Sequence, residues 1–210
     1  FYPTKEAENS NIKNRPVGLG IMGTHDMLHK LGIIYDSQEA VELCDRVQEF
    51  ISLYAIKTSA LLAKEKGSYP TFGGSEWDKG NFPIDTYCEM LSQRNPRAIP
   101  EDEGSFETLE EWDSVRELVS KYGMRNSNVM AIAPTATISY IQGCSQSIEP
   151  DYSVLFVYST LSGEFTMIND HFVSLAKKKG IWSQALVDAL KSVDGDVTAL
   201  VDLDEDLKEP

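Results

Sequence analysis

Cysteine is scarce in this chain. Three cysteines occur in 210 residues, at Cys44, Cys88 and Cys144, and none has the CxxC spacing of a redox motif or a thiolate metal site. An odd number of widely separated cysteines does not form a disulfide framework. The sequence therefore predicts a reducing, cytoplasmic setting.

Basic residues are also few. The 19 Lys and Arg face 33 Asp and Glu, giving a net charge of -14, which argues against a nucleic-acid groove or an anionic membrane surface. No apolar run approaches the roughly 20 residues that cross a bilayer. The first residues, FYPTKEAENS, lack the features of a signal peptide and do not begin with Met, as expected of a fragment or a processed piece. We expect neither nucleic acid nor a membrane as a partner.

The hydrophobic residues, 41% of the chain, are enough for a globular core, and local signals divide the chain into elements. Helices are predicted over 24–32, 36–67, 111–123, 165–179 and 183–191, strands over 129–133 and from residue 152, and an ordered irregular loop over 68–87. Strands alternating with well-capped helices are typical of an α/β fold with parallel pairing.

The sequence GLGIMG, with Gly18, Gly20 and Gly23, matches the dinucleotide fingerprint GxGxxG. That fingerprint follows an apolar strand, whereas NIKNRPV precedes Gly18. We therefore favour glycines that allow close packing within a sheet or barrel over a nucleotide-binding turn.

Histidines could hold a metal or simply pack. His25 and His29 are four residues apart, which places them on one face of a helix, but no third ligand is near in sequence. Packed or surface histidines are the better interpretation, and His171, alone in sequence, is predicted to be structural.

Two further residues have competing interpretations. Cys144 could be a nucleophile, but no base can be named for it, so an inert thiol is preferred. Glu149 is held extended by Pro150, and its carboxylate either orients a ligand or pairs with a cation such as Arg125. The sequence leaves both roles of Glu149 open.

The stretch AIAPTATISYI places three hydroxyls and no charge after an apolar run. Thr135 or a neighbour can cap a helix, which leaves unpaired the amides of Ala136, Thr137, Ile138 and Ser139. Such amides and the nearby hydroxyls also suit phosphate oxygens, and without a P-loop lysine they would bind phosphate but not transfer it. From the residues alone, a plain helix cap is favoured over an anion site.

Several separated stretches resemble, in order, the large catalytic subunit of ribonucleotide reductase. They are RPVGLGIMG, AKEKGSYPTFGGSEWDKGNFPIDTY, YGMRNSNVMAIAPTATIS and GCSQSIEPDYS. The succession of RNS, a strand, PTATIS and SIEP is more specific than any one stretch, and the resemblance extends over essentially all 210 residues.

The resemblance implies a fold and a site. It places residues 1–210 in the C-terminal part of the barrel domain, as the second half of a ten-stranded α/β barrel. It also implies that the substrate's phosphates, those of a ribonucleoside diphosphate, are held by Pro134, Thr135, Ala136, Thr137, Ile138 and Ser139. The expected reaction replaces the ribose 2′-hydroxyl by hydrogen, for deoxyribonucleotide synthesis.

Some parts of the family pattern are not recognisable in this sequence. They are the finger loop Asn-x-Cys-x-Glu, the reducing cysteine pair, the ATP-cone and the C-terminal tyrosine pair. We expect the chain by itself to be inactive, to contribute no catalytic residue and to bind no metal or cofactor.

The missing parts imply partners. These are the N-terminal part of the large subunit and a metal-bearing small subunit that generates the radical. The stretches PTATIS and LSGEF favour class I over the adenosylcobalamin-dependent class. The alternative is a split-gene or barrel-completing interaction module without activity of its own.

Overall fold

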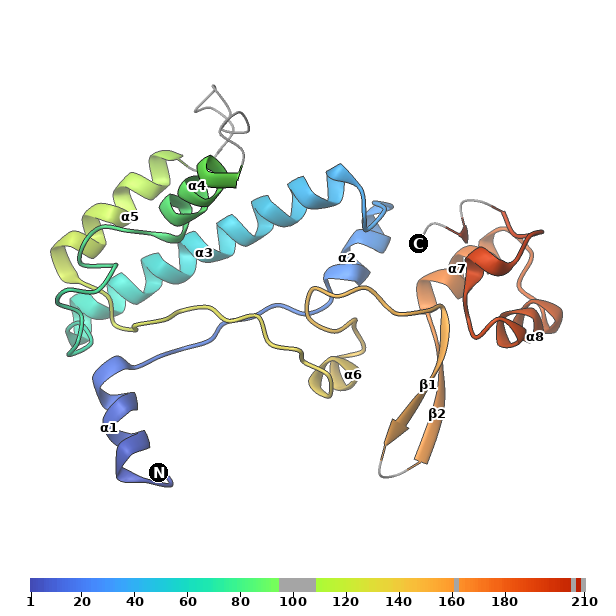
Figure 1. Cartoon of the computed structure of the whole chain (residues 1–210), viewed down its shortest axis with the longest axis horizontal. Coiled ribbons are helices and arrows are strands. Elements are labelled where there is room, and N and C mark those ends of the chain that lie inside the picture. Colours follow the sequence, from blue (N-terminus) through green and yellow to red (C-terminus); the bar gives the residue numbers. More distant parts are fainter. Residues whose placement is uncertain (95–108, 161–162, 205–206, 209–210) are drawn as a thin grey trace. The chain divides into compact units, whose positions relative to one another are not determined.

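The computed structural model describes residues 1–94, 109–160, 163–204 and 207–208. The chain forms two compact units, unit 1 of residues 1–19 and 45–131 and unit 2 of residues 20–44 and 132–210. The elements are α1 Lys5–Asn14, α2 Thr24–Leu31, α3 Gln38–Lys66, α4 Pro83–Arg94, α5 Leu109–Tyr122, α6 Ile138–Gln142, β1 Leu155–Thr160, β2 Gly163–Ile168, α7 Asp170–Lys178, α8 Gln184–Ser192 and the 3-10 turn η2 Val197–Ala199 (Figure 1). Over the described ranges, no helix combines the length and apolarity that a membrane crossing requires.

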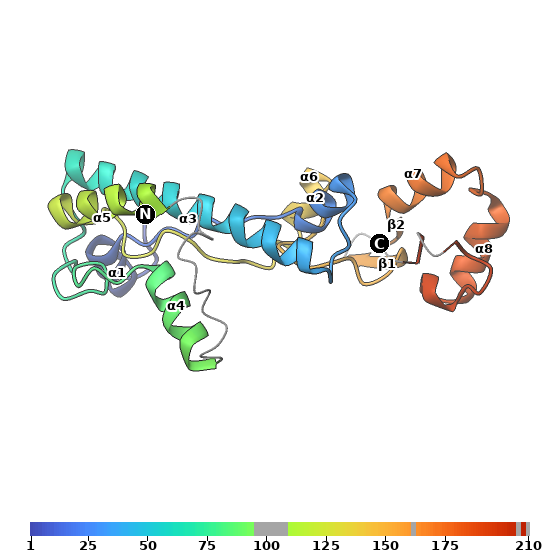
Figure 2. The same ribbon diagram turned by 90° about the horizontal axis from the view of Figure 1, so that it is seen from above.

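Unit 1 is built on two helices that pack side by side. Helix α5 lies along the C-terminal half of α3 in both views (Figures 1 and 2). Their contact consists of fully buried apolar side chains at helical spacing, Leu53, Ile56 and Ala60 from α3 and Trp112, Val115 and Val119 from α5. The predicted helices over 36–67 and 111–123 are confirmed to within two residues at each end.

The aromatic loop after α3 is ordered by burial of its rings. Tyr69 and Phe82 are buried in the core of unit 1, and Trp77 Nε1 donates to the Ser127 carbonyl at 2.8 Å. The predicted loop is confirmed through residue 82, but residues 83–87 were wrongly included, because they begin α4. Pro83 suits a first helical position, and Asp85 Oδ2 accepts from the Phe82 amide at 2.8 Å. The predicted polar stretch around Pro96 and Pro100 lies outside the described residues.

An extended parallel pair crosses unit 1. Leu19 and Met130 form an isolated parallel bridge, with the Leu19 amide bonded to the Val129 carbonyl at 3.0 Å. The strand predicted over 129–133 is thus limited to one bridge, because a strand needs a continuous ladder of partners. A Cβ added to Gly18 would lie 3.0 Å from the Ala131 Cβ, which is the close packing expected of these glycines.

Unit 2 centres on a hairpin and two helices. Strands β1 and β2 pair antiparallel from Leu155↔Ile168 to Thr160↔Gly163. The buried core beside them consists of Val154, Leu155, Phe172, Ala176, Leu190, Val197, Leu203 and Leu207. The helix predicted over 183–191 is confirmed as α8, with Ser183 as its N-cap.

The helix predicted from Phe165 was wrong in its first turn and a half. Residues 163–168 form β2, and the helix α7 begins only at Asp170. Its N-cap is Asn169, whose side chain accepts from the Phe172 amide at 2.9 Å. The mixture of helices and strands agrees with the predicted class, but within the described ranges the one sheet has two antiparallel strands, so the ten-stranded barrel stays a prediction.

Candidate functional site

The segment predicted to bind phosphate forms an exposed turn before a short helix in unit 2. Thr135 has a left-handed backbone with φ 52°, and α6 starts at Ile138 with Thr137 as its N-cap. No side-chain hydrogen bond caps this helix, so the predicted plain cap by a hydroxyl is not what the structure has. Pro134, Ala136, Thr137 and Ile138 are exposed to solvent.

Three successive amides of this turn belong to exposed residues and have no partner in the described part of the chain. The N–H groups of Ala136, Thr137 and Ile138 make no hydrogen bond to any residue that the structure describes. The Ser139 amide differs, because it donates to the Thr135 carbonyl at 3.0 Å. Three of the four amides expected to be free are therefore available to an acceptor.

Two hydroxyls of the segment, those of Thr135 and Ser139, lie on residues that are not exposed. Thr135 Oγ1 accepts from the Ser147 amide at 2.8 Å. Ser139 is fully buried, and its Oγ has no partner among the described residues. Only the hydroxyl of Thr137, of the three in this segment, lies on an exposed residue.

The loop of residues 144–147 is hydrogen-bonded to this turn. The Cys144 amide donates to the Ser139 carbonyl at 3.1 Å, and Ser147, itself left-handed with φ 46°, donates to Thr135. Ser147 is 2% exposed and its Oγ also lacks a partner among the described residues. Buried unpaired hydroxyls are uncommon in native proteins and are often found at functional sites.

The start of α2 is also hydrogen-bonded to this loop. The Gly23 amide donates to the Ser145 carbonyl at 2.9 Å, the Ser145 amide donates to Asp26 Oδ2, and the Asp26 amide donates to Ser145 Oγ at 3.4 Å. Burial raises the pKa of Asp26, but its contacts with Ser145 and His171 outweigh this and keep that pKa below its usual value. No local pattern in the sequence points to this role of Asp26, because Ser145 lies 119 residues away.

All three histidines of the chain meet in unit 2. The His25 and His29 rings are 4.1 Å apart, His29 stacks on His171 at 4.9 Å, and His171 Nε2 lies 3.0 Å from Asp26 Oδ1. Within the described residues, no group of three or more His, Cys, Asp or Glu side chains is arranged to hold a metal ion. The ring contacts agree with the preference for packed histidines. His171, predicted to be structural, is part of this cluster.

Burial sets the charge of two of these rings. It lowers the pKa of His25, whose Nδ1 accepts from the Asp151 amide at 3.2 Å and is therefore unprotonated. It also lowers the pKa of His29 to about 4, with smaller contributions from His25 and His171. His29 is therefore neutral at physiological pH.

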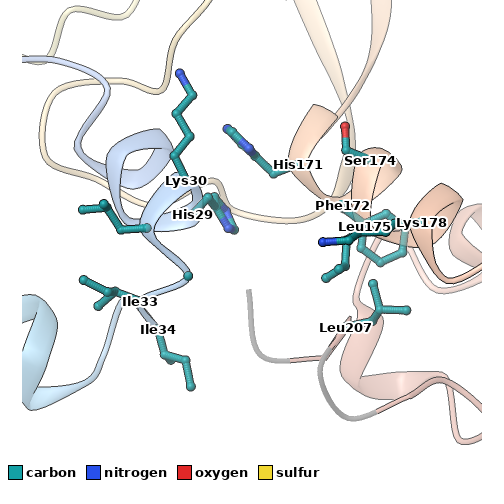
Figure 3. Close-up of a pocket in the computed structure, with 12 residues that line it drawn as sticks. His29, Lys30, Ile33, Ile34, His171, Phe172, Ser174, Leu175, Lys178 and Leu207 are labelled. Atoms are coloured by element: carbon teal, nitrogen blue, oxygen red, sulfur yellow. The ribbon is translucent and has the colours of Figure 1, made fainter.

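A pocket of about 670 Å³ opens beside the cluster (Figure 3). His29 and Lys30 of α2 and His171, Ser174 and Lys178 of α7 contribute its polar lining. The exposed segment from Pro134 to Ser139, which the sequence predicts to bind phosphate, does not line it. The pocket and the predicted site are therefore separate features of unit 2.

The remaining residues singled out from the sequence are the cysteines Cys144 and Cys88, Arg125 and Glu149. Burial raises the pKa of the Cys144 thiol, and nearby Asp26 raises it further, which agrees with an inert thiol. The side chain of Cys88 lies outside the described residues. Arg125 Nη1 donates to the carbonyls of Lys66 and Gly67 at the end of α3, while Glu149 is exposed.

Comparison with known proteins identifies the family. The family "Ribonucleotide reductase, barrel domain" matches residues 1–209. The chain is 49% identical over 208 residues, 99% of its length, to the ribonucleoside-diphosphate reductase subunit alpha of Chlamydia trachomatis serovar D. It is 44% identical over 164 residues, 78% of its length, to the same subunit of Helicobacter pylori, and 35% identical over 209 residues, 99% of its length, to the large subunit of Trypanosoma brucei brucei.

The match covers a small share of each relative. The chain spans 20% of the bacterial subunits and 25% of the trypanosome protein. These similarities agree with the resemblance seen in the sequence and extend over both units. The chain belongs to the ribonucleotide reductase barrel-domain family.

Proposed function

We propose that this chain is the C-terminal part of the catalytic barrel domain of a ribonucleoside-diphosphate reductase large subunit, where it holds the phosphates of the substrate. The segment from Pro134 to Ser139 is the proposed cradle. The observation that carries the proposal is the row of three amides, on the exposed residues Ala136, Thr137 and Ile138, that have no partner among the described residues.

The physical basis is the anion-binding capacity of consecutive amides. A left-handed residue followed by right-handed ones turns successive N–H groups toward one point, and this concave arrangement receives anionic oxygens. Thr135, with φ 52°, precedes Thr137, with φ -105° and ψ -43°. Helix α6 has five residues, so the individual amides, more than a macrodipole, would provide the attraction.

The lack of charge in this segment suits binding without phosphoryl transfer. Amides and the Thr137 hydroxyl can hold a diphosphate, while no lysine of the segment would stabilise a leaving phosphoryl group. Binding energy at the phosphates would position the ribose for chemistry supplied elsewhere in the enzyme. This division fits a chain that contributes no catalytic cysteine.

The chemistry would come from partners. The expected partners are the N-terminal part of the large subunit, which completes the barrel, and a metal-bearing small subunit, which supplies the radical in a class I enzyme. The chain's own role requires no metal or cofactor. A cytoplasmic setting belongs to the same proposal.

A second candidate function is barrel completion without substrate binding. The parallel pair in unit 1 exposes apolar side chains, with Val17 51% and Leu19 49% accessible. Exposed apolar residues on two extended segments joined by a single bridge favour addition of further strands. Such a module would associate with the rest of the large subunit whether or not its 134–139 segment binds phosphate.

Thr137→Asp in the complete large subunit, assayed with its small subunit, separates the two candidates. A carboxylate beside the free amides would repel phosphate, so we expect KM for a ribonucleoside diphosphate to rise about a hundredfold or activity to disappear. Thr58→Asp, which adds the same charge to an exposed residue of α3, is the control. Normal KM in Thr137→Asp would contradict phosphate binding and leave barrel completion.

A further inference from the structure

The conformation of Thr135 requires support. A β-branched residue rarely takes a positive φ, and such a conformation persists where neighbours impose it. At Thr135 the neighbour is Ser147, whose amide donates to Thr135 Oγ1 at 2.8 Å. Ser147 is itself left-handed, so it depends on further contacts.

Those further contacts come from the first turn of α2. The Thr24 amide approaches the Ser147 carbonyl at 3.5 Å, and the Gly23 amide bonds the Ser145 carbonyl at 2.9 Å. Asp26 contacts Ser145 twice, receiving its amide on Oδ2 and donating its own amide to Ser145 Oγ. Asp26 is thus the one side chain of α2 that bonds this loop.

The second carboxylate oxygen of Asp26 is also occupied. His171 projects from α7 toward α2 (Figure 3), and its Nε2 lies 3.0 Å from Asp26 Oδ1. The two side chains are 23% and 27% exposed, so solvent competes only partly for these contacts. With one oxygen on His171 and the other on Ser145, the carboxylate has little freedom to rotate.

We infer that Asp26 is a positioning residue for the phosphate cradle, acting through Ser145 and Ser147 on Thr135, and that His171 orients its carboxylate. The inference rests on the proposed function, since it concerns the same segment. Asp26 itself bonds Ser145 and His171 and not the residues of the cradle. Its role is to hold Thr135 in the conformation that aligns them.

The chemistry of the contacts explains why an aspartate is required. Both the Ser145 amide and the His171 ring offer donors, and a carboxylate accepts on both oxygens. An asparagine has one acceptor oxygen, so Asp26→Asn either faces one of these donors with an NH₂ group or requires the His171 tautomer whose Nε2 accepts. Either way the two contacts are no longer charge-assisted, and charge-assisted hydrogen bonds are stronger than neutral ones.

The test is Asp26→Asn in the complete large subunit, with its small subunit present. We expect KM for a ribonucleoside diphosphate to rise about tenfold with kcat changed less than twofold, because substrate is held less well and the chemistry is untouched. Partial unfolding would instead lower the apparent kcat and leave KM unchanged. Asp36→Asn, which removes an exposed carboxylate of the same unit, is the matched control and should leave both constants unchanged.

A double-mutant cycle with Thr135→Val tests whether Asp26 acts on the cradle through Thr135. Because valine keeps the shape of Thr135 but cannot accept from Ser147, Asp26→Asn should raise KM less than twofold in its presence. A full tenfold rise in that background, or no rise in the single variant, would overturn the inference. If Asp26→Asn does not fold, His171→Gln is judged by the same criterion.

The proposed function fails separately. Should Thr137→Asp raise KM while Asp26→Asn does not, the cradle stands and the role of Asp26 is refuted. Should neither variant change KM, the cradle itself is refuted.

Discussion

The two units bury different kinds of side chain. Among the described residues, the buried polar side chains of unit 1 are Ser52 and Ser59, whereas those of unit 2 are Thr24, His25, Ser139, Ser145 and Ser147. Unit 1 is held by apolar area, which is non-directional. The part of unit 2 around the proposed cradle is held by hydrogen bonds, which fix orientation.

Because the two units are held by different interactions, substitutions in them should have different effects. A substitution in the core of unit 1 should lower the free energy of unfolding, and a substitution in the network of unit 2 should move the cradle. The buried, unpaired hydroxyls of Ser139 and Ser147 extend the contrast, because each one costs about 1 to 3 kcal/mol. Among the described residues, unit 1 has one such buried atom without a partner, Arg15 Nε, whereas unit 2 has these two hydroxyls and His29 Nε2.

The largest stability effect is expected for Phe82→Ala. Phe82 is 2% exposed and packs edge-on against Trp77 and Trp112, with the Arg116 guanidinium 4.6 Å from its ring centre. Its truncation should cost about 3 to 5 kcal/mol in chemical denaturation. Phe50→Ala, at a ring 55% exposed on α3, is the control and should cost less than about 1 kcal/mol. Equal costs would contradict an apolar core at Phe82.

Acid should act first on unit 2, through His29. Its pKa of about 4 lies below the ordinary value of 6.5, so the unfolded chain binds the extra proton between these values. The contribution of His29 is complete above pH 6.5 and is lost as pH falls toward 4, amounting to about 2 to 3 kcal/mol. His29→Phe keeps a ring against His171 and should flatten this dependence.

The ring of His29 can be observed directly. Its C2 proton should titrate near pH 4 in an NMR pH series. A midpoint near the ordinary 6.5 would contradict the buried, neutral state.

The elements that the sequence predicts correctly are those whose signals are local. Helix α3 has apolar residues at helical spacing and ends just before Gly67, so these signals lie within one stretch of sequence. Strand β2 was predicted as helix because Phe165 to Ile168 precede a true helix, and the cap at Asn169 was overlooked. The strand β2 and the helix α7 were therefore predicted as one helix.

The candidate site shows the limit of local signals more clearly. PTATIS and its amides could be found from the sequence, and so could the interpretation of the histidines as packed. The left-handed backbone of Thr135 could not, since threonine disfavours it and Ser147 imposes it from 12 residues away. The Asp26–Ser145 contact spans 119 residues, and no periodicity or cap reports it.

Glycine substitutions at the helix ends of unit 1 should have intermediate effects. Gly67 has φ 80° with nothing within 4 Å of an added Cβ, so Gly67→Ala should cost about 1 kcal/mol of backbone strain. Gly123 has φ 73°, and an added Cβ would lie 2.8 Å from the Ser68 Cβ. Gly123→Ala should therefore cost about 1 kcal/mol more in thermal unfolding. Equal costs at the two sites would mean that Ser68 moves freely aside.

The smallest effect, below about 1 kcal/mol, is expected for Asp85→Asn in unit 1. Asp85 receives Arg116 on both oxygens, at 2.6 and 2.9 Å, but the two side chains are 40% and 32% exposed, so solvent screens the pair. Although burial raises the pKa of Asp85, its contacts with Arg116 and Phe82 lower it overall. A depressed carboxyl pKa stabilises the fold above the ordinary value of 3.8, and this contribution is lost as pH falls below it. Unit 1 should thus lose stability at a lower pH than unit 2. Denaturation of wild type, Asp85→Asn and His29→Phe, followed between pH 3 and 7, should resolve two acid transitions. A single transition shared by all three proteins would contradict this difference between the units.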